Sequence, residues 1–595
     1  MSTAACDFGW KRLFLTVLIA GLPASAALAQ PSPLAQVPAK APIVVQMHGW
    51  ERTLGRFKEM VKAGAPDYAG LLAGKLEAGM ADALMGRELK GLAKDGPMFL
   101  VFTDVPKEGD DLPEMALVAR VTNYKEFRDG LLKDDERSAI KAKDGVETTK
   151  MGDREVYFLN RGDYAVLTAS EKARKIFQDK SFTSLAGKLD KSLEAKLVES
   201  DLSVLVDAKA VTKHYGDEIA ALRASIEQGF QFLEGQESMS KEQLEMAKTM
   251  VSGLFQMVED CDRAVLAAKF EPDGLAVQAH TQFGDKTKTN DVLKIARPGS
   301  SAGIGRLPGS SMIYAAGNVG QEYAKLYGSL AMGGGNFGSG VAEDKAVAAV
   351  RKELEDLKVN DWATSTNIPV EGVQLFRYQD SQKAVAAHLK LYRAVPENSG
   401  LGGLAIKGRP DVKENAEKLG SFTFHAVNYR IDIDRTLEKQ PDEARELVKG
   451  LLQKVLGDEQ RIWIGTDGKT VIQVTTKDWK SASQKLDSVI AGKESLAATP
   501  GFSATRKRLP ENANLLIMID GARYAYTIAD TLGELVGQLG LPAAAKPNKP
   551  AGGASYIGLA LTMQPGNGTL DVWAPAEAVK AMIKVLQPFI EGLKE

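Results

Sequence analysis

Short apolar runs and amphipathic stretches follow one another in a repeated order along the chain. The stretch "LSVLVDAKAVTKHYGDEIAAL" (Leu202–Leu222) reads as an apolar strand, a polar break and a helix with one apolar stripe. The stretch "LLIMIDGARYAYTIADTLGEL" (Leu515–Leu535) aligns with it without a gap, so that Asp207 meets Asp520. The helix positions that coincide in the two copies are Val211, Tyr215, Ile219 and Leu222 with Tyr524, Ile528, Leu532 and Leu535.

Two kinds of hairpin also occur once in each half. "REVYFLNRGDYAVLTASEKARKIF" begins at Arg154 and "RIWIGTDGKTVIQVTTKDWKSASQKL" begins at Arg461, and each predicts a strand, a glycine turn, a strand and a helix start. Residues 263–283 and 555–575 each predict a hairpin whose turn contains proline and glycine. We therefore predict an α+β fold of two tandem similar lobes, each a largely antiparallel sheet packed against helices on one face.

The N-terminus predicts export. Lys11 and Arg12 precede the apolar run "LFLTVLIAGL", and "AALAQ" supplies small residues at Ala27 and Ala29, so we expect a signal peptide cleaved before Gln30. A short membrane anchor is the alternative, but the small-residue cleavage site disfavours it. The expected localisation is extracytoplasmic, in the periplasm or secreted, with no stable membrane span after cleavage. The expected boundaries are 1–29 for the signal peptide, 30–41 for a proline-rich tether without a packing role, 42–300 for the first lobe and 301–595 for the second.

Composition excludes some partners and cross-links. The 595 residues are 44% hydrophobic and 26% charged, which is ordinary for a globular protein, and the formal net charge of −2 gives no reason to expect nucleic acid. Cys6 lies in the expected signal peptide, which leaves Cys261 as a single thiol and excludes an intramolecular disulfide. Cys261 has the alternatives of a nucleophile or a bridge between chains, and we predict a small buried side chain instead.

The two matching acidic residues have two interpretations. Asp207 and Asp520 could form a pair of acids, one in each lobe, or they could cap the helices that follow them by accepting backbone N–H bonds. Weaker copies of the same unit (43–61 and 311–331) place Gln46 and Ala315 at this position, and neither residue can act as an acid. We therefore predict capping, which makes the unit a structural element.

Other motifs match functional patterns only in part. "GGGNFG" (333–338) follows a predicted helix instead of a strand, and Ser301 within "GSSAG" lies between prolines, so we predict a loop and an inter-lobe connection. The "RGD" of residues 161–163 falls at a hairpin tip, where turn chemistry explains it. Asp432 and Asp434 are predicted on one face of a strand, beside arginines that can pair with them.

No catalytic, cofactor-binding or metal-binding residues are predicted, and no cofactor is expected. The five histidines show no ligand spacing, although a site assembled from distant residues stays open. Residues 238–260 predict a helix with one apolar face, and its methionines are expected to fill the core. The histidines are His48, His214, His280, His388 and His425. The helix positions are Leu244, Ala247, Val251, Leu254 and Val258, widened by Met246, Met250 and Met257.

The export signal and the four strand–helix units resemble exported bacterial proteins of unknown function built from repeated strand–helix units. This resemblance implies a non-enzymatic class and transfers no site residues. We predict a soluble extracytoplasmic binding or assembly protein that uses the cleft between lobes or an exposed sheet face. Its partner would be an unknown protein or a small apolar ligand. The alternatives are a periplasmic carrier of an apolar ligand such as lipid, and a hydrolase with a site assembled from distant residues.

Overall fold

The computed structural model contains helices and antiparallel strands, which confirms the predicted α+β class. The expected signal peptide and the glycine-rich stretch at 333–338 lie outside the residues that it describes. These are residues 32–592 without residues 85, 107–112, 180, 236–240, 297–298, 300, 319–344, 402–403, 439–441 and 539–545. Within them, no helix combines the length and apolar character that crossing a membrane requires.

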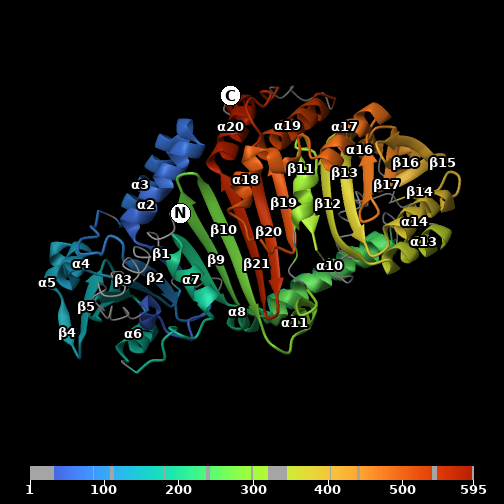
Figure 1. Ribbon diagram of the computed structural model, residues 1–595. Coiled ribbons are helices and arrows are strands. Elements are labelled where there is room, and N and C mark those ends of the chain that lie inside the picture. Colours follow the sequence, from blue (N-terminus) through green and yellow to red (C-terminus); the bar gives the residue numbers. More distant parts are fainter. Residues whose placement is uncertain are drawn as a thin grey trace, which may run out of the picture.

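Every strand of the described part belongs to one antiparallel sheet (Figure 1). Its strands up to residue 283 are β1 (Ile43–His48), β2 (Pro97–Phe102), β3 (Met115–Arg120), β4 (Lys141–Lys143), β5 (Val146–Met151), β6 (Arg154–Asn160), β7 (Tyr164–Thr168), β8 (Leu202–Asp207), β9 (Cys261–Glu271) and β10 (Gly274–Phe283). The later strands are β11 (Ile313–Gly317), β12 (Val359–Asn367), β13 (Glu371–Tyr378), β14 (Gly400–Leu401), β15 (Leu404–Leu419), β16 (Phe422–Ile431), β17 (Glu459–Thr466), β18 (Val471–Thr475), β19 (Leu515–Asp520), β20 (Tyr556–Gln564) and β21 (Asn567–Pro575).

The spatial order of the strands has its centre between β10 and β21. Outward from β10 the order is β9, β8, β1, β2, β3, β7, β6, β5 and β4. Outward from β21 it is β20, β19, β11, β12, β13, β18, β17, β16, β15 and β14. The two-lobe prediction implied two separate sheets. The two halves instead share one continuous sheet. Pairing β10 with β21 satisfies the backbone groups of two strands that would otherwise be exposed edges.

Helices connect the strands at both ends of the sheet and on both of its faces. In the first half they are η1 (Pro33–Gln36), α2 (Trp50–Gly64), η2 (Pro66–Tyr68), α3 (Ala69–Leu84), α4 (Tyr124–Gly130), α5 (Asp134–Ser138), α6 (Glu171–Gln178), α7 (Lys191–Glu199), α8 (Ala208–His214), α9 (Gly216–Gly235), α10 (Lys241–Asp260) and α11 (Lys288–Leu293). In the second half they are η3 (Ser301–Arg306), α13 (Lys345–Asp356), α14 (Ser381–Ala394), α15 (Ile433–Thr436), α16 (Asp442–Leu456), α17 (Trp479–Ala491), η4 (Leu496–Ala498), α18 (Pro500–Arg506), α19 (Gly521–Gln538) and α20 (Ala576–Gly592).

The two matching aspartates cap helices, as predicted. The Asp207 carboxylate accepts the backbone N–H of Ala210 at 3.0 Å, at the start of α8. The Asp520 carboxylate accepts the backbone N–H of Arg523 at 3.3 Å, at the start of α19. Each bond satisfies one of the N–H groups that a helix start leaves without a partner.

The prediction of a tether without a packing role is wrong for residues 32–41. This segment forms η1, and Leu34 and Val37 are fully buried in the core of the first half. The corresponding segment of the second half behaves alike, because Ser301 begins η3 and Ile304 and Leu307 are buried. Proline suits such short helices because its fixed φ fits their first turn.

One face of the sheet, here named the covered face, carries the two largest cores. In the first half Val44 and Leu205 pack there beneath η1, α6 and α7. In the second half Leu516 and Met518 pack there beneath η3, η4, α17 and α18. The prediction of helices over a single face is incomplete, because α4 and α14 pack on the opposite face.

Two further predictions are wrong. Residues 430–435 are not a strand throughout: β16 ends at Ile431, and Asp432 instead caps α15. The apolar face of α10 enters the core at Leu244, which is 3% exposed, but the prediction is wrong for Leu254, Met257 and Val258, which are 56%, 41% and 46% exposed. Helix α10 packs against other helices, α8, α9 and α11, instead of lying on the sheet.

Candidate functional site

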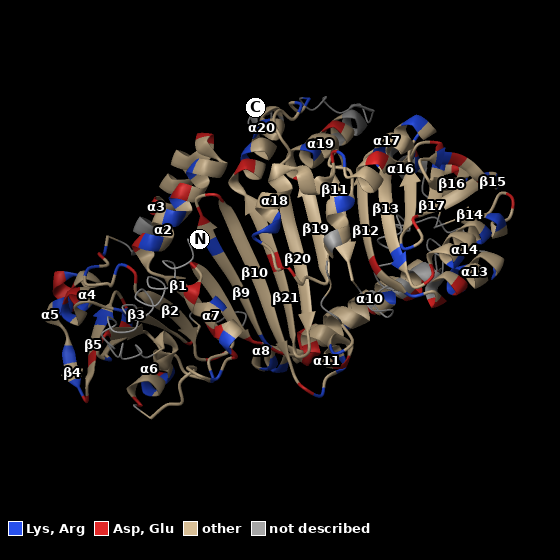
Figure 2. Cartoon of the chain, in the orientation of Figure 1, with Lys and Arg blue, Asp and Glu red and all other residues tan. Residues whose placement is uncertain are grey.

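Strands β8 and β9, beside the centre of the sheet, carry apolar residues on both faces. In β8 the residues Val204 and Leu205 point to opposite faces, as do Val265 and Leu266 in β9. Strands with apolar residues on both faces are usually buried on both. Figure 2 shows the same pattern, since the charged residues gather on helices and outer loops while the central strands are largely uncharged.

The face opposite the covered face, here named the open face, carries two rows of directly paired apolar side chains. Each row runs across the strands, because each residue is the register partner of the next. Row one is Leu167, Leu117, Leu100, Val45, Val204, Leu266, Ala279, Leu570, Leu561 and Leu515. Row two is Met98, Met47, Leu202, Ala268, Val277, Val572, Leu559, Ile517 and Ala315.

Exposure distinguishes the two faces of the same strands. On the covered face Val265 is 1% exposed, whereas its neighbour Leu266 in row one is 53% exposed. The other members of both rows are half-buried, and Val45, Val204 and Val277 belong to none of the buried cores. Two central rows of large apolar side chains therefore remain accessible on the open face.

Helices surround the open face. Phe127 of α4 packs with Leu117 and Leu167 at one end of row one, and the core beneath α14 includes Leu515 and Leu561 at the other. Figure 1 shows α2, α20 and α19 along one end of the central strands and α8 and α11 along the opposite end. Between these helices Leu266 of row one is 53% exposed, and the neighbouring members of both rows are half-buried.

Two of the helices around the open face, α2 and α19, are held in place by contacts with the sheet. The ring of Phe57 in α2 lies edge-on to Phe270 of β9, with 5.4 Å between ring centroids. Gly521 begins α19 where a Cβ atom would meet Met582 of α20 and Ile557 of β20. The open face is thus a bounded area of the sheet.

The dimensions and chemistry of this area favour an apolar ligand. Leu167 and Leu117 at one end of row one, and Leu561 and Leu515 at the other, pack against buried cores. The six residues between them, from Leu100 to Leu570, span about 24 Å at about 4.8 Å per strand. Both rows consist of Leu, Ile, Val, Met and Ala, which offer neither charge nor hydrogen bonds. Such a surface favours binding of apolar groups by removing them from water and provides no group for catalysis.

Behind the open face, a buried polar network lies on the covered face where the halves meet. Gln278 of β10 donates to the Asp571 carboxylate of β21 at 2.6 Å, and Lys196 of α7 donates to the Gln278 amide oxygen at 3.0 Å. Thr569 and His280 face each other at 2.9 Å across the same joint. Burial lowers the pKa of both Lys196 and His280. Such a bonded network fixes the register in which β10 and β21 pair.

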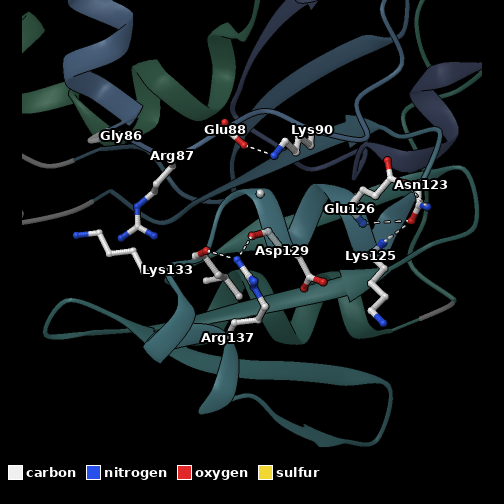
Figure 3. Close-up of a pocket in the computed structure, with 12 residues that line it drawn as sticks. Gly86, Arg87, Glu88, Lys90, Asn123, Lys125, Glu126, Asp129, Lys133 and Arg137 are labelled. Atoms are coloured by element: carbon white, nitrogen blue, oxygen red, sulfur yellow. Dashed lines mark hydrogen bonds and ion pairs between the residues drawn. The ribbon is translucent and has the colours of Figure 1, made fainter.

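A charged surface pocket of about 550 Å³ lies beside α4 and α5 (Figure 3). Its Arg87 donates to the Glu136 carboxylate at 2.8 Å, and this ion pair holds the pKa of Glu136 at about 2. Lys90 pairs with Glu88, and Arg137 pairs with Asp134 at 3.2 Å. The pocket therefore uses most of its charges in local ion pairs, and we assign no site to it.

The histidines lie in separate surroundings and form no common site. His48 contacts Arg52 and the Val198 carbonyl, His280 lies in the polar network, and His425 accepts the N–H of Asn415. Among the described residues, no group of three acidic, histidine or cysteine side chains could hold a metal ion.

Cys261 and Arg161, which the sequence analysis considered as candidate functional residues, are held by contacts within the fold. Cys261 is buried at the start of β9, and burial raises the pKa of its thiol to about 11. Arg161 of the "RGD" turn donates to the Phe177 carbonyl at 2.6 Å and to the Gln36 amide oxygen at 3.1 Å. The turn arginine is therefore held within the fold.

His388 in α14 gives a pH-dependent prediction. It is 2% exposed, its Nε2 faces the Tyr378 hydroxyl at 3.2 Å, and burial lowers its pKa to about 4. Between pH 6.5 and 4 the unfolded chain takes up a proton that the folded chain excludes. The free energy of unfolding should therefore fall by about 3 kcal/mol across that window because of this residue.

Chemical denaturation of the wild type and of His388→Gln measures this effect. The glutamine stays neutral and can still bond to Tyr378, so the variant should show a shallower loss of stability between pH 6.5 and 4. Above pH 7 the difference between the two proteins should not change with pH. Parallel curves throughout the acidic range would contradict the assignment.

Sequence reasoning gave the strands but not the open face. The available signal was that "IVV" (43–45), "VLV" (204–206) and "LLIMI" (515–519) are apolar at consecutive positions. This signal predicts burial on both faces. It contains no information on which face lacks a covering helix.

No protein-family model, curated protein or solved structure matches this chain.

Proposed function

We propose that the chain is an extracytoplasmic, non-catalytic carrier that binds long apolar chains, such as the acyl chains of lipids, on the open face of its sheet. The observation that carries the proposal is the pair of uncharged rows, in which Leu266 is 53% exposed while Val265 behind it is 1% exposed. The extracytoplasmic part rests on the signal-like sequence of residues 1–29.

The free energy available on this surface is sufficient for a carrier. Each buried methylene contributes about 0.8 kcal/mol, so ten methylenes contribute about 8 kcal/mol before the costs of association. The stretch of row one between its covered ends, about 24 Å, is longer than a chain of ten methylenes, so the ligand can vary in length without leaving the rows. Recognition of this kind selects apolar chains and does not need a specific polar contact.

A protein is the other class of binding partner that the sequence allows. The helices around the open face disfavour it. A second sheet packs at about 10 Å from the first, which is also about the diameter of a helix. Helices on four sides of the open face would hold another sheet away from Leu266 and Val277. A flexible chain can lie between the same helices.

The proposal includes a duplicated scaffold. The outward strand order from β10 and from β21 follows the same succession, and the aspartate caps of α8 and α19 occupy matching places. These observations support the copying of an ancestral unit. Both copies then contribute strands to the open face, because rows one and two continue from β10 to β21.

The test is to purify the protein from its own host under native conditions and extract it for lipid analysis. We expect acyl lipids to be retained, and the stripped protein to bind hexadecanoic acid. An empty protein that does not bind hexadecanoic acid would falsify the carrier function. A stable lipid-free dimer would also overturn it and would favour an assembly function.

A further inference from the structure

The register of the sheet relates the two rows to each other. The turn between β9 and β10 closes on the pair Glu271–Gly274, and the turn between β20 and β21 closes on the pair Gln564–Asn567. Superposing these two turns places Leu266 of row one on Leu559 of row two. The same superposition places three more residues of row one on residues of row two. These are Ala279 on Val572, Leu570 on Val277 and Leu561 on Ala268.

The next strands outward continue the relation. Superposing the cap Asp207 on Asp520 places Val204 of row one on Ile517 of row two. It places Leu202 of row two on Leu515 of row one. Exchanging the halves therefore exchanges the rows and reverses their direction, because β10 and β21 are antiparallel neighbours at the centre.

We infer that the open face binds two acyl chains at once, one along each row, with their head groups at opposite ends. This inference rests on the proposed carrier function. Neighbouring rows are two residues apart along each strand, or about 6.8 Å. That spacing exceeds the carbon–carbon contact distance of about 4 Å, so a chain on one row leaves the other row free. The ligand class is a single-chain amphiphile such as a long-chain fatty acid.

Native mass spectrometry of the stripped full chain with hexadecanoic acid measures the stoichiometry. We expect saturation at two molecules per chain. Leu266→Glu in row one and Leu559→Glu in row two should each reduce the stoichiometry to one. Leu254→Glu on α10, which is 56% exposed and outside both rows, is the matched control and should retain two. Saturation at one in the wild type would overturn the inference while leaving the carrier function in place.

Orientation is tested with a fatty acid that carries pyrene at the end of its chain. At saturation, antiparallel chains keep the two pyrenes at opposite ends, so we expect monomer emission without an excimer band. Excimer emission at two molecules per chain would overturn the antiparallel arrangement. Loss of both molecules from either single glutamate variant, with an unchanged circular dichroism spectrum, would overturn the assignment of one chain to each row. No binding by any variant or by the wild type would remove the carrier function itself.

Discussion

Placing one glutamate in each row, as Leu266→Glu with Val277→Glu, should reduce the affinity for hexadecanoic acid by about 100-fold or more. Both side chains lie on the central strands β9 and β10, next to the joint between the halves. A carboxylate held against an acyl chain loses its water without gaining a partner. A penalty of about 3 kcal/mol is enough for a 100-fold loss. Fluorescence displacement or calorimetric titration measures the change.

The control for this variant is a glutamate on an apolar position outside the rows. Leu254→Glu on α10 adds the same charge at a site that is 56% exposed, so it should keep wild-type affinity. Circular dichroism and the denaturation midpoint establish that both variants remain folded. Wild-type affinity in the folded double variant would show that the ligand does not lie on the open face.

The second large effect concerns stability and compares two leucines on neighbouring strands. Leu205 of β8 is 2% exposed on the covered face, and Leu266 of β9 is 53% exposed on the open face. Leu205→Ala should lower the free energy of unfolding by about 2–5 kcal/mol, because it removes buried methyl groups and leaves a cavity. Leu266→Ala should cost less than about 1 kcal/mol, because much of its side chain already contacts water.

Urea denaturation of the ligand-free protein measures both values. The two variants carry the same substitution, so their difference isolates the contrast between the faces. If Leu266→Ala costs as much as Leu205→Ala, the open face is covered in solution. That result would remove the physical basis of the carrier. Added hexadecanoic acid should raise the midpoint of the wild type by mass action.

The sequence predicted individual elements well where local chemistry decides them. The strands and hairpins around Arg154 and Arg461, and the caps Asp207 and Asp520, follow from alternation, turn glycines and N-cap chemistry. It failed at Leu34 and Val37, where a proline-rich segment forms η1 and enters the core. Proline content signals a stiff chain, but burial depends on which distant surface lies nearby.

Local sequence patterns could not predict the candidate site. The sequence offered a cleft between lobes or an exposed sheet face as the binding surface, and it did not record that both halves share one sheet. The apolar stripe of α10 was expected in the core, yet Leu254 and Val258 are exposed because the helix packs on other helices. A periodic stripe shows that a helix has an apolar side and does not specify what that side contacts.

The sequence by itself determined the repeated strand–helix units, the two kinds of hairpin and the α+β class, because these depend on residues within one element or its neighbours. Only the tertiary structure decided that β10 and β21 join the halves and that two apolar rows stay uncovered. The reason is physical: strand pairing and helix placement bring together residues that are hundreds of positions apart, such as Gln278 and Asp571. Those contacts are governed by competition among all available edges and faces, and no local pattern records its outcome.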